Sequence, residues 1–289
     1  MNFPKATLER FKHIEFLLQF RGWVNRSDLI DYFEIGEAAA TRDFRHYKDL
    51  CPENMALNKS SKKWELQAET FIPRFPLTSS TVFAKLRNPQ LSEAVGLGIG
   101  DYALSPPRLS FPDTETLAVI TRAIALKSAV RIVYVAASRV SEFAEIVPHS
   151  LVDNGLRWHV RSYDRTNNRY WDFVLGRVSS AELINGKLQL HETIENDTQW
   201  NRQVRLELIP HPNKENLPNA EALMLEYGME EGLLIHTVRA AVAGYWLRLW
   251  NVDCSKDSSL KGKHYQLSLN NPQTLYDVSN ALMAPGYLS

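Results

Sequence analysis

The sequence predicts an α+β protein made of several domains. Three short helical patterns followed by a basic hairpin occupy the first 71 residues. In the middle of the chain, one helix leads into a series of short strand-like runs. A mixed pattern of helices and strands follows from about residue 201. The length of 289 residues is enough for two or three domains with separate cores.

The composition limits the classes of function. Hydrophobic residues make up 44% and charged residues 23%, which is typical of a soluble globular protein. Lysine plus arginine equals aspartate plus glutamate, 33 against 33, so any nucleic-acid site must come from local clustering of charge. The chain shows no apolar run that could span a bilayer and no signal peptide, so we expect a cytoplasmic protein without membrane contact.

Motifs for catalysis or metal binding are not found in the sequence. There is no HExxH, no nucleophile elbow and no P-loop. Cys51 and Cys254 lie far apart and match no zinc or disulfide framework. We therefore expect a protein that is not an enzyme and that needs no cofactor and no metal.

The N-terminal helices have the order of a helix-turn-helix. Residues 7–20 show apolar side chains at helical spacing, with Thr7 as the expected N-cap. A second helix starts near Ser27, its expected N-cap, and a tight turn with Gly36 separates it from a third helix over residues 37–50. Two strand-like runs, "MALN" and "KWELQ", then flank the basic turn "KSSK". This order predicts a winged helix-turn-helix.

The third helix has two different faces. Ala40, Phe44 and Tyr47 fall on one face, and Arg42 and Arg45 lie on the opposite side. Arginine reads guanine through two parallel hydrogen bonds, and the lysines of the hairpin turn would hold phosphates. The expected DNA-binding residues are Ser27, Ala39, Thr41, Arg42, Arg45, His46, Lys48, Lys59, Ser60, Lys62 and Lys63. The alternative is a protein-interaction winged helix, since residues 1–70 carry eleven basic and eleven acidic side chains.

A proline-rich connector follows. We expect a helix near residues 79–87, and a second helix over residues 114–129 with Thr114 as its cap. The stretch "GLGIGDY" at 96–102 lacks the spacing of a dinucleotide-binding loop and is assigned to the linker.

The second half of the chain predicts two further β-rich parts. Four strand-like runs, from "VRIVYVAA" to "YWDFVLGRV", and a fifth run, "KLQLHETI", are separated by the turn signals "DNG" and "NG", which indicates a small barrel. Beyond residue 201 we expect three strands, a helix at "NAEALMLEYG" and a last helix at "PQTLYDVSNALM". The run "AGYWLRLWNVD" fits either period.

The central runs resemble a known family. "RIVYVAAS", "VPHSLVDNGLRWHVRSYD" and "DFVLGRV" resemble the WYL domain, an SH3- or Sm-like β-barrel of bacterial transcription regulators, with Trp158-His159-Val160 at its signature tripeptide. The whole order of domains is similar to that of the BrxR-like repressors of BREX-type phage-defence systems. The resemblance implies a homodimeric repressor of a defence operon whose WYL domain senses a nucleotide or nucleic-acid ligand. This sequence has Ala144 and Glu145, and also Trp171, where WYL domains often carry arginine.

Strand alternation suggests where such a ligand would bind. His159, Arg161 and Tyr163 lie on one face of their strand, where charge would hold phosphate and an aromatic ring would stack on a base. The expected ligand-binding residues are Tyr134, Ser138, His149, Trp158, His159, Arg161, Tyr163 and Arg177. The alternative is that Trp158 and Val160 are core residues and the opposite face is a solvated strand surface.

These patterns predict four segments: residues 1–71, a DNA-binding winged helix-turn-helix; 72–128, a linker and helical connector; 129–200, a ligand-sensing WYL domain; and 201–289, a dimerising α+β extension with "GYWLRLWNV" at its interface. The expected partners are double-stranded DNA with an inverted-repeat operator, a second copy of the chain, and a nucleotide or single-stranded effector. Two alternatives remain open: a ligand-switched activator, and a nucleic-acid-sensing adaptor within a defence complex.

Overall fold

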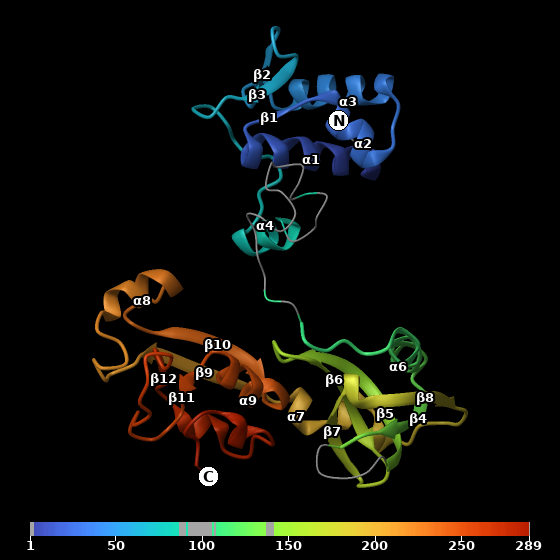
Figure 1. Cartoon of the computed structure of the whole chain (residues 1–289), viewed down its shortest axis with the longest axis vertical. Coiled ribbons are helices and arrows are strands. Elements are labelled where there is room, and N and C mark those ends of the chain that lie inside the picture. Colours follow the sequence, from blue (N-terminus) through green and yellow to red (C-terminus); the bar gives the residue numbers. More distant parts are fainter. Residues whose placement is uncertain (1–2, 87–90, 92–105, 107, 137–141, 289) are drawn as a thin grey trace. The chain divides into compact units, whose positions relative to one another are not determined.

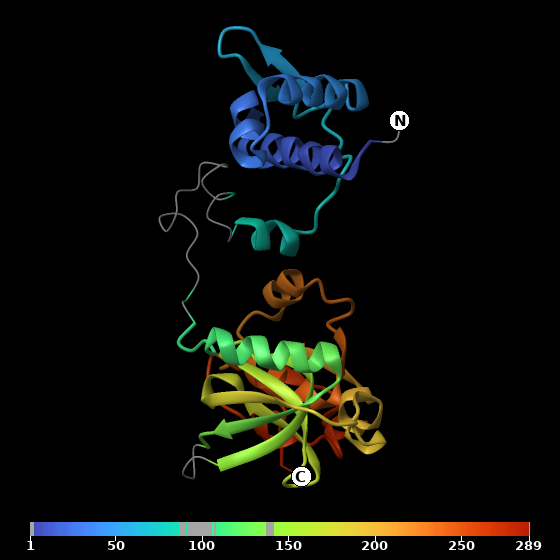
Figure 2. The same cartoon turned by 90° about the vertical axis from the view of Figure 1, so that its right-hand side faces the viewer.

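The computed structural model describes residues 3–86, 91, 106, 108–136 and 142–288. The chain divides into two compact units, Met1–Pro106 and Pro107–Ser289, and each has its own hydrophobic core (Figures 1 and 2). The stretch 96–102 and the predicted ligand residue Ser138 lie outside the described residues.

The first unit is a three-helix bundle with a small antiparallel sheet. Its elements are α1 Lys5–Arg21, β1 Trp23–Val24, α2 Arg26–Phe33, α3 Glu37–Leu50, β2 Met55–Asn58, β3 Lys63–Leu66 and α4 Ser79–Leu86. The strand order is β1-β3-β2, so β3 lies between the short strand after α1 and the strand after α3. The predicted winged helix-turn-helix is confirmed.

The core of this unit joins α1 to α3. Phe11 and Leu18 of α1 are fully buried, and Phe44 and Tyr47 of α3 pack in the same cluster. The carboxylate of Glu15 is buried, where it accepts a hydrogen bond from the Tyr47 hydroxyl at 2.8 Å. It also accepts bonds from the backbone amides of residues 74 and 75, at 3.0 and 2.6 Å. One buried acid thus fixes both the third helix and the segment that follows the hairpin.

The N-cap of α2 is Asn25, so the expectation of Ser27 is wrong. The Asn25 side chain accepts from the Asp28 amide, and the Asp28 carboxylate accepts from the Asn25 amide. This capping box satisfies two amides that a cap at Ser27 would leave open. Ser27 instead donates its hydroxyl proton to the Asn25 side chain, at 2.7 Å.

Two other expected caps are also displaced. Helix α1 begins after Pro4, so Thr7 lies inside its first turn. Helix α6, Thr114–Leu126, is capped by Asp113, whose carboxylate accepts from the Thr116 amide at 2.9 Å. In both cases the helix begins earlier than expected.

The first part of the second unit is a strongly bent antiparallel sheet covered by α6 (Figure 2). Its elements are β4 Ala129–Tyr134, β5 Glu142–Asp153, β6 Trp158–Asp164, β7 Arg169–Val174, η1 Leu175–Arg177 and β8 Val178–Ile184. The strand order is β7-β6-β5-β4-β8. The predicted turn between β5 and β6 is present, with Gly155 at φ +86°, a conformation that glycine adopts without strain. Buried Ile132, Ile146 and Val160 form the core against Ile120 of α6.

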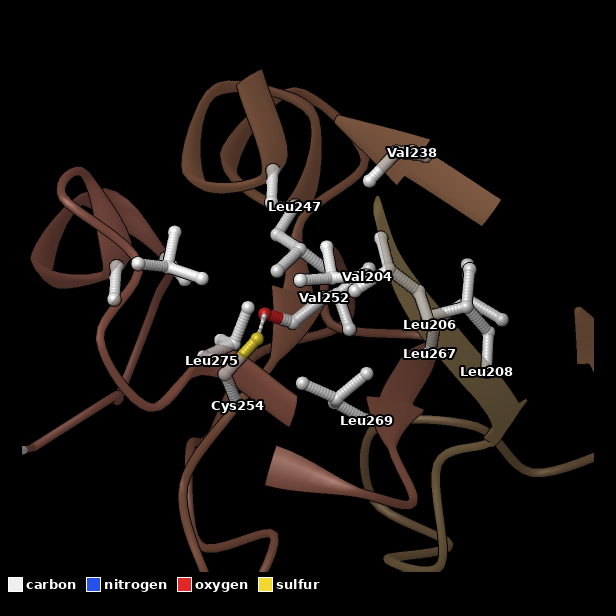
Figure 3. Close-up of a cluster of buried hydrophobic side chains, with 14 of the residues drawn as sticks. Val204, Leu206, Leu208, Val238, Leu247, Val252, Cys254, Leu267, Leu269 and Leu275 are labelled. Carbon is white, nitrogen blue, oxygen red and sulfur yellow. Dashed lines mark hydrogen bonds between the residues drawn. The ribbon is translucent and has the colours of Figure 1, made fainter. Parts of the chain in front are cut away.

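The remainder of the second unit is a four-stranded sheet with helices. Its elements are η2 Leu190–Glu192, η3 Ile194–Asn196, α7 Thr198–Asn201, β9 Gln203–Pro210, α8 Ala220–Tyr227, β10 Leu234–Arg239, α9 Ala240–Leu249, β11 Val252–Asp253, β12 Leu267–Leu269, η4 Pro272–Leu275 and η5 Ala281–Met283. The strand order is β10-β9-β12-β11. Figure 3 shows its apolar core, in which Leu206, Leu247 and Leu269 converge from β9, α9 and β12. The predicted α+β multidomain fold is confirmed.

Two predicted elements are not formed. The expected strand "KLQLHETI" is instead a pair of 3-10 turns, because Gln189 and Glu192 form a capping box that starts η2. The expected last helix is interrupted at Asp277, which has φ +58°, and only η4 and η5 remain. The Asn280 side chain accepts from the Gly244 amide and donates to the Ala241 carbonyl of α9, which holds this irregular segment in place. The ambiguous run at 243–253 is mostly the helix α9.

Candidate nucleic-acid interface and effector face

Helix α3 presents a polar face because its other face is anchored in the core. Ala40, Phe44 and Tyr47 are buried, as the helical spacing predicts. Thr41, Arg42 and Arg45 are exposed, while Ala39 is half-buried near the start of the helix. Neither arginine makes an ion pair or a side-chain hydrogen bond with any described residue, so both guanidinium groups are available to a ligand.

The hairpin turn between β2 and β3 is held by one asparagine. The Asn58 side chain accepts from the backbone amides of Ser60 and Ser61, at 2.9 and 3.2 Å. Lys62 has φ +55°, which closes the turn. Lys59, Ser60 and Lys62 are exposed at its tip. The turn therefore projects two lysines from a fixed backbone.

Between α3 and the hairpin lies a groove of about 490 Å³. Its apolar lining residues are Phe44, Leu57 and Trp64. Its charged lining residues are five basic side chains and one acidic side chain, namely Arg26, Arg45, Lys48, Lys59, Lys62 and Asp49. A concave surface with this excess of positive charge attracts phosphate, even though the chain as a whole is neutral.

Besides Ser27, which donates to Asn25, and Thr41, which accepts from Arg26, three more of the predicted DNA-binding side chains have partners within the unit. The Lys48 ammonium donates to the carbonyls of Pro52 and Met55, beyond the C-terminus of α3. The Lys63 ammonium lies 3.6 Å from the centroid of the Trp23 ring. The His46 ring packs against Phe3, with 5.5 Å between ring centroids. Direct DNA contact by these three residues stays a prediction.

Arg26 is a groove residue that the sequence did not single out. It is exposed at the first position of α2, and its guanidinium donates to the Thr41 hydroxyl at 3.4 Å. The signal was present, since Arg26 directly precedes Ser27 at the helix start. Only the packing of α2 on α3 brings it beside the polar face of α3.

On the central sheet, the predicted ligand residue Arg161 is buried in an internal network. Its guanidinium donates to both carboxylate oxygens of Asp197, at 2.8 and 3.0 Å, and to Asp172 at 3.3 Å. Burial alone would raise the pKa of Asp197, but hydrogen bonds from His149 and Arg161 outweigh it and hold that pKa well below its usual range. The Tyr245 hydroxyl of α9 donates to Asp172 at 2.9 Å. The network therefore ties the barrel to α7 and α9.

Other predicted ligand residues surround this network. His149 lies at the register shift of β5, where its Nε2 is 3.2 Å from Asp197. His159 is buried and stacked on Tyr245, with burial as the main cause of a lowered pKa, and its Nδ1 has no hydrogen-bond partner in the described structure. Tyr163 is buried against Tyr170. Val160 is a core residue, as the alternative expected, but the opposite face is buried and not solvated.

The last predicted ligand residues lie toward the edges of this sheet. Tyr134 is half-buried and its hydroxyl accepts from the Val174 amide at 3.3 Å. Trp158 is half-buried beside Arg108. Arg177 is half-buried and makes no ion pair with any described residue. Ligand binding by these residues stays a prediction.

Three family models match the chain. Residues 6–87 match the BrxR transcriptional regulator winged helix-turn-helix domain. Residues 115–183 match the WYL domain. Residues 203–275 match the BrxR transcriptional regulator C-terminal dimerization domain. The chain belongs to the BrxR-type transcriptional regulators with a WYL domain.

Curated relatives of this BrxR-type regulator span nearly its whole length. The DNA-binding transcriptional repressor CapW of Escherichia coli strain KTE188 is 28% identical over 274 residues, which cover 92% of this chain and 90% of that protein. CapW of Pseudomonas aeruginosa is 27% identical over 280 residues, covering 93% and 90%. CapW of Stenotrophomonas maltophilia is 27% identical over 258 residues, covering 84% and 83%.

A solved structure of the proteasome accessory factor B/C of Arthrobacter aurescens is similar at 14% identity and a TM-score of 0.27. The match covers 96% of the BrxR-type chain and about half, 48%, of that longer chain.

Within the described residues of the BrxR-type chain, no group of histidine, cysteine and carboxylate side chains has the arrangement of a metal site. None of the described helices combines the length and apolar character needed to cross a membrane.

Proposed function

We propose that this chain is a homodimeric repressor that binds promoter DNA through α3 and the β2–β3 hairpin, and that it acts in the cytoplasm on a phage-defence operon. The observation that carries the proposal is the groove beside α3, with five basic side chains and one acidic side chain. The relatives are named as DNA-binding transcriptional repressors, which supports repression and not activation of the promoter.

The two parts of the interface have different roles in this proposal. Arg42 and Arg45 lie exposed on α3, where a helix in the major groove presents donors to base edges. Lys59 and Lys62 lie on the hairpin turn and would bind phosphates, which position the protein without reading sequence. Arg26 joins the phosphate-binding group, since it borders the same groove.

The two-fold symmetry of a homodimer determines the arrangement of the operator sequence. The C-terminal domain matches a dimerization domain, and a homodimer related by a two-fold axis places its two recognition helices on equivalent sequences. The operator is therefore an inverted repeat with half-sites about 34–36 Å apart, or a multiple of that distance.

An electrophoretic mobility shift assay with DNA from upstream of the chain's own operon tests the proposal. The expected result is a discrete shift that an excess of scrambled duplex does not remove, at moderate salt. A reporter strain that lacks the gene should show increased expression from the same promoter. Equal binding to operator and scrambled DNA would contradict sequence-specific recognition, and reduced expression in the deletion strain would contradict repression.

We further propose that an effector acts on the second unit and changes DNA affinity. The supporting observation is the Arg161–Asp197–Asp172 network, which connects the barrel to α9 of the dimerization domain. Arg177 offers the cleanest test among the predicted ligand residues, since it has no ion-pair partner in the described structure. Replacement of Arg177 by glutamine should change induction in the reporter strain and leave basal operator binding intact.

A further inference from the structure

The segment 108–113, directly before α6, is bound to the barrel at its start. Its residues lie outside helices and strands. The Arg108 guanidinium donates to both carboxylate oxygens of Asp153, at 2.9 and 2.5 Å. It also lies 5.5 Å from the centroid of the Trp158 ring. A bidentate ion pair, the geometry that fixes a guanidinium best, thus holds the start of the segment on the β5–β6 hairpin.

The same segment makes a second contact with the barrel, at η1. A Cβ on Gly176 would lie 2.5 Å from the Ser110 hydroxyl oxygen, so Ser110 packs here against backbone that carries no side chain. Leu109 and Phe111, on either side of Ser110, are 97% and 68% exposed. Alternate residues of the segment therefore contact the barrel, and Arg108 provides the charged contact.

The turn that carries Asp153 also contacts the C-terminal domain. The Asp153 carboxylate accepts from the Gly155 amide at 2.9 Å, which fixes the turn. The Leu249 side chain, at the end of α9, lies against this glycine, because a Cβ on Gly155 would be 2.6 Å from a Leu249 methyl carbon. Helix α9 lies within the residues that match the dimerization domain. One turn therefore connects the start of the segment to the domain that joins the two copies.

We infer that the Arg108–Asp153 pair determines which spacing of operator half-sites the dimer accepts. The DNA-binding unit is joined to the second unit through the chain that precedes Arg108. With the pair intact, this chain leaves the second unit at a point that is fixed to the dimerization domain. In a two-fold dimer the two exit points then lie at one fixed separation. The inference rests on the proposed function, a homodimer on an inverted repeat.

The length of the segment sets the size of the effect. Helix α6 fixes the chain from Asp113 onward, because Asp113 caps this helix and Ile120 is buried in the core. Full release of residues 108–112 would free a stretch that spans up to about 17 Å, at roughly 3.3–3.6 Å per residue. One base pair adds about 3.4 Å to the distance between half-sites. Release would thus give each copy extra reach equal to about five base pairs.

Reach and spacing preference are linked through the effective concentration of the second DNA-binding unit. Two linked modules bind most tightly when the link matches the distance between their sites, and a longer link lowers the affinity. A bound segment therefore favours one spacing strongly, whereas a released segment accepts several spacings and binds the native one less tightly. Arg108 thus acts as a positioning residue that selects operators without touching DNA.

Fluorescence anisotropy with a set of duplexes tests the inference on the full chain. The duplexes carry the upstream operator at its native half-site spacing, with base pairs inserted or removed between the half-sites, or with a single half-site. The wild type should prefer the native spacing by about tenfold or more. Arg108→Gln should bind the native spacing about three- to tenfold more weakly and the altered spacings at least as tightly as the wild type. Its affinity for the single half-site should be unchanged.

Matched variants assign the effect to the pair. Asp153→Asn removes the charge but keeps an oxygen acceptor for the Gly155 amide, and it should flatten the spacing preference in the same way. The double variant should then match either single variant, because both act through one interaction. Arg131→Gln is the control, since the Arg131–Glu145 pair is an exposed ion pair elsewhere on the barrel. An unchanged spacing preference in Arg108→Gln, or equal flattening in the control, would overturn the inference.

Two further readouts separate the possible failures. A lower melting temperature or a dissociated dimer in Arg108→Gln would show that the pair maintains the fold, and would also overturn the inference. If the wild type prefers one spacing and Arg108→Gln keeps that preference, the inference alone is rejected. If the wild type does not bind the operator, or binds two half-sites no more tightly than one, the proposed function itself is rejected.

Discussion

Two groups of cationic side chains in this molecule have opposite surroundings. Arg42 and Arg45 of α3 are exposed and have no ion-pair partner among the described residues. Arg161 of β6 is only 3% exposed and is paired with Asp197 and Asp172. A buried guanidinium requires carboxylate partners, because desolvation of an unpaired charge is costly, whereas water solvates an exposed one. The α3 arginines can thus donate hydrogen bonds to DNA directly, while an anion at Arg161 must displace a carboxylate.

The largest effect should come from breaking the buried pair. Asp197→Ala leaves Arg161 partly unpaired and removes the N-cap of α7, so the second unit should lose about 3–5 kcal/mol of stability. Asp197→Asn should cost less, since the amide oxygen still accepts hydrogen bonds. Differential scanning calorimetry measures both. Arg131→Gln is the control, because the Arg131–Glu145 pair is solvent-exposed, and it should change stability by less than about 1 kcal/mol. Equal losses in Asp197→Ala and the control would mean that the network is not important for stability.

The exposed arginines should affect recognition and not folding. Arg42→Ala or Arg45→Ala should weaken operator binding by about 1–3 kcal/mol each and leave the melting temperature unchanged. Fluorescence anisotropy with operator and scrambled duplexes separates specific from non-specific affinity. Lys214→Ala removes an exposed charge from the second unit and serves as the control. A similar loss on both duplexes would assign these arginines to phosphate contacts instead of base contacts.

The two units should also differ in their response to pH. Burial lowers the pKa of His13 in α1 to about 4, and its Nε2 has no hydrogen-bond partner in the described structure. The folded pKa of His13 lies below its unfolded value. The contribution of neutral His13 to the stability of the first unit is therefore fully present above about pH 6.5 and is lost as the pH falls toward 4. The Asp197 network has a lowered carboxylate pKa, so its contribution persists in that window and is lost only below about pH 4.

Calorimetry at pH 7 and pH 4.5 tests this difference. The free energy of unfolding of the first unit should be lower at pH 4.5 than at pH 7, by an amount on the order of 2–3 kcal/mol. The free energy of unfolding of the second unit should fall by less. His13→Phe, which keeps an aromatic ring against Tyr32, should remove most of the shift. Persistence of the full shift in this variant would exclude His13 as the titrating group.

The sequence predicted local structure and missed long-range pairing. The buried and exposed faces of α3 follow from helical spacing, so Phe44 and Arg45 were assigned correctly to opposite faces. Asp197, the carboxylate partner of Arg161, is 36 residues away in the sequence. The sequence places its segment in the same domain but indicates no function for it. Strand alternation shows which side chains share a face, but it does not show what covers that face. The same limit hid Arg26, which lies beside α3 only through tertiary packing.

The smallest effect is expected from the replacement of either of two adjacent lysines of the hairpin, Lys62 and Lys63. Lys62 is exposed at the turn, whereas the Lys63 ammonium lies over the Trp23 ring. Lys62→Ala should weaken operator and scrambled DNA alike, and should reduce the slope of log affinity against log salt by about 1, as expected for one lost phosphate contact. Lys63→Ala removes the same charge, but the Lys63 ammonium already lies over the Trp23 ring. The slope of log affinity against log salt should therefore change much less in this variant. Anisotropy titrations at several salt concentrations measure both slopes. If both variants reduce the slope by the same amount, Lys63 leaves Trp23 to bind phosphate, and both lysines belong to the interface. If neither variant changes the slope, the hairpin does not contact DNA, and recognition depends on α3 and Arg26.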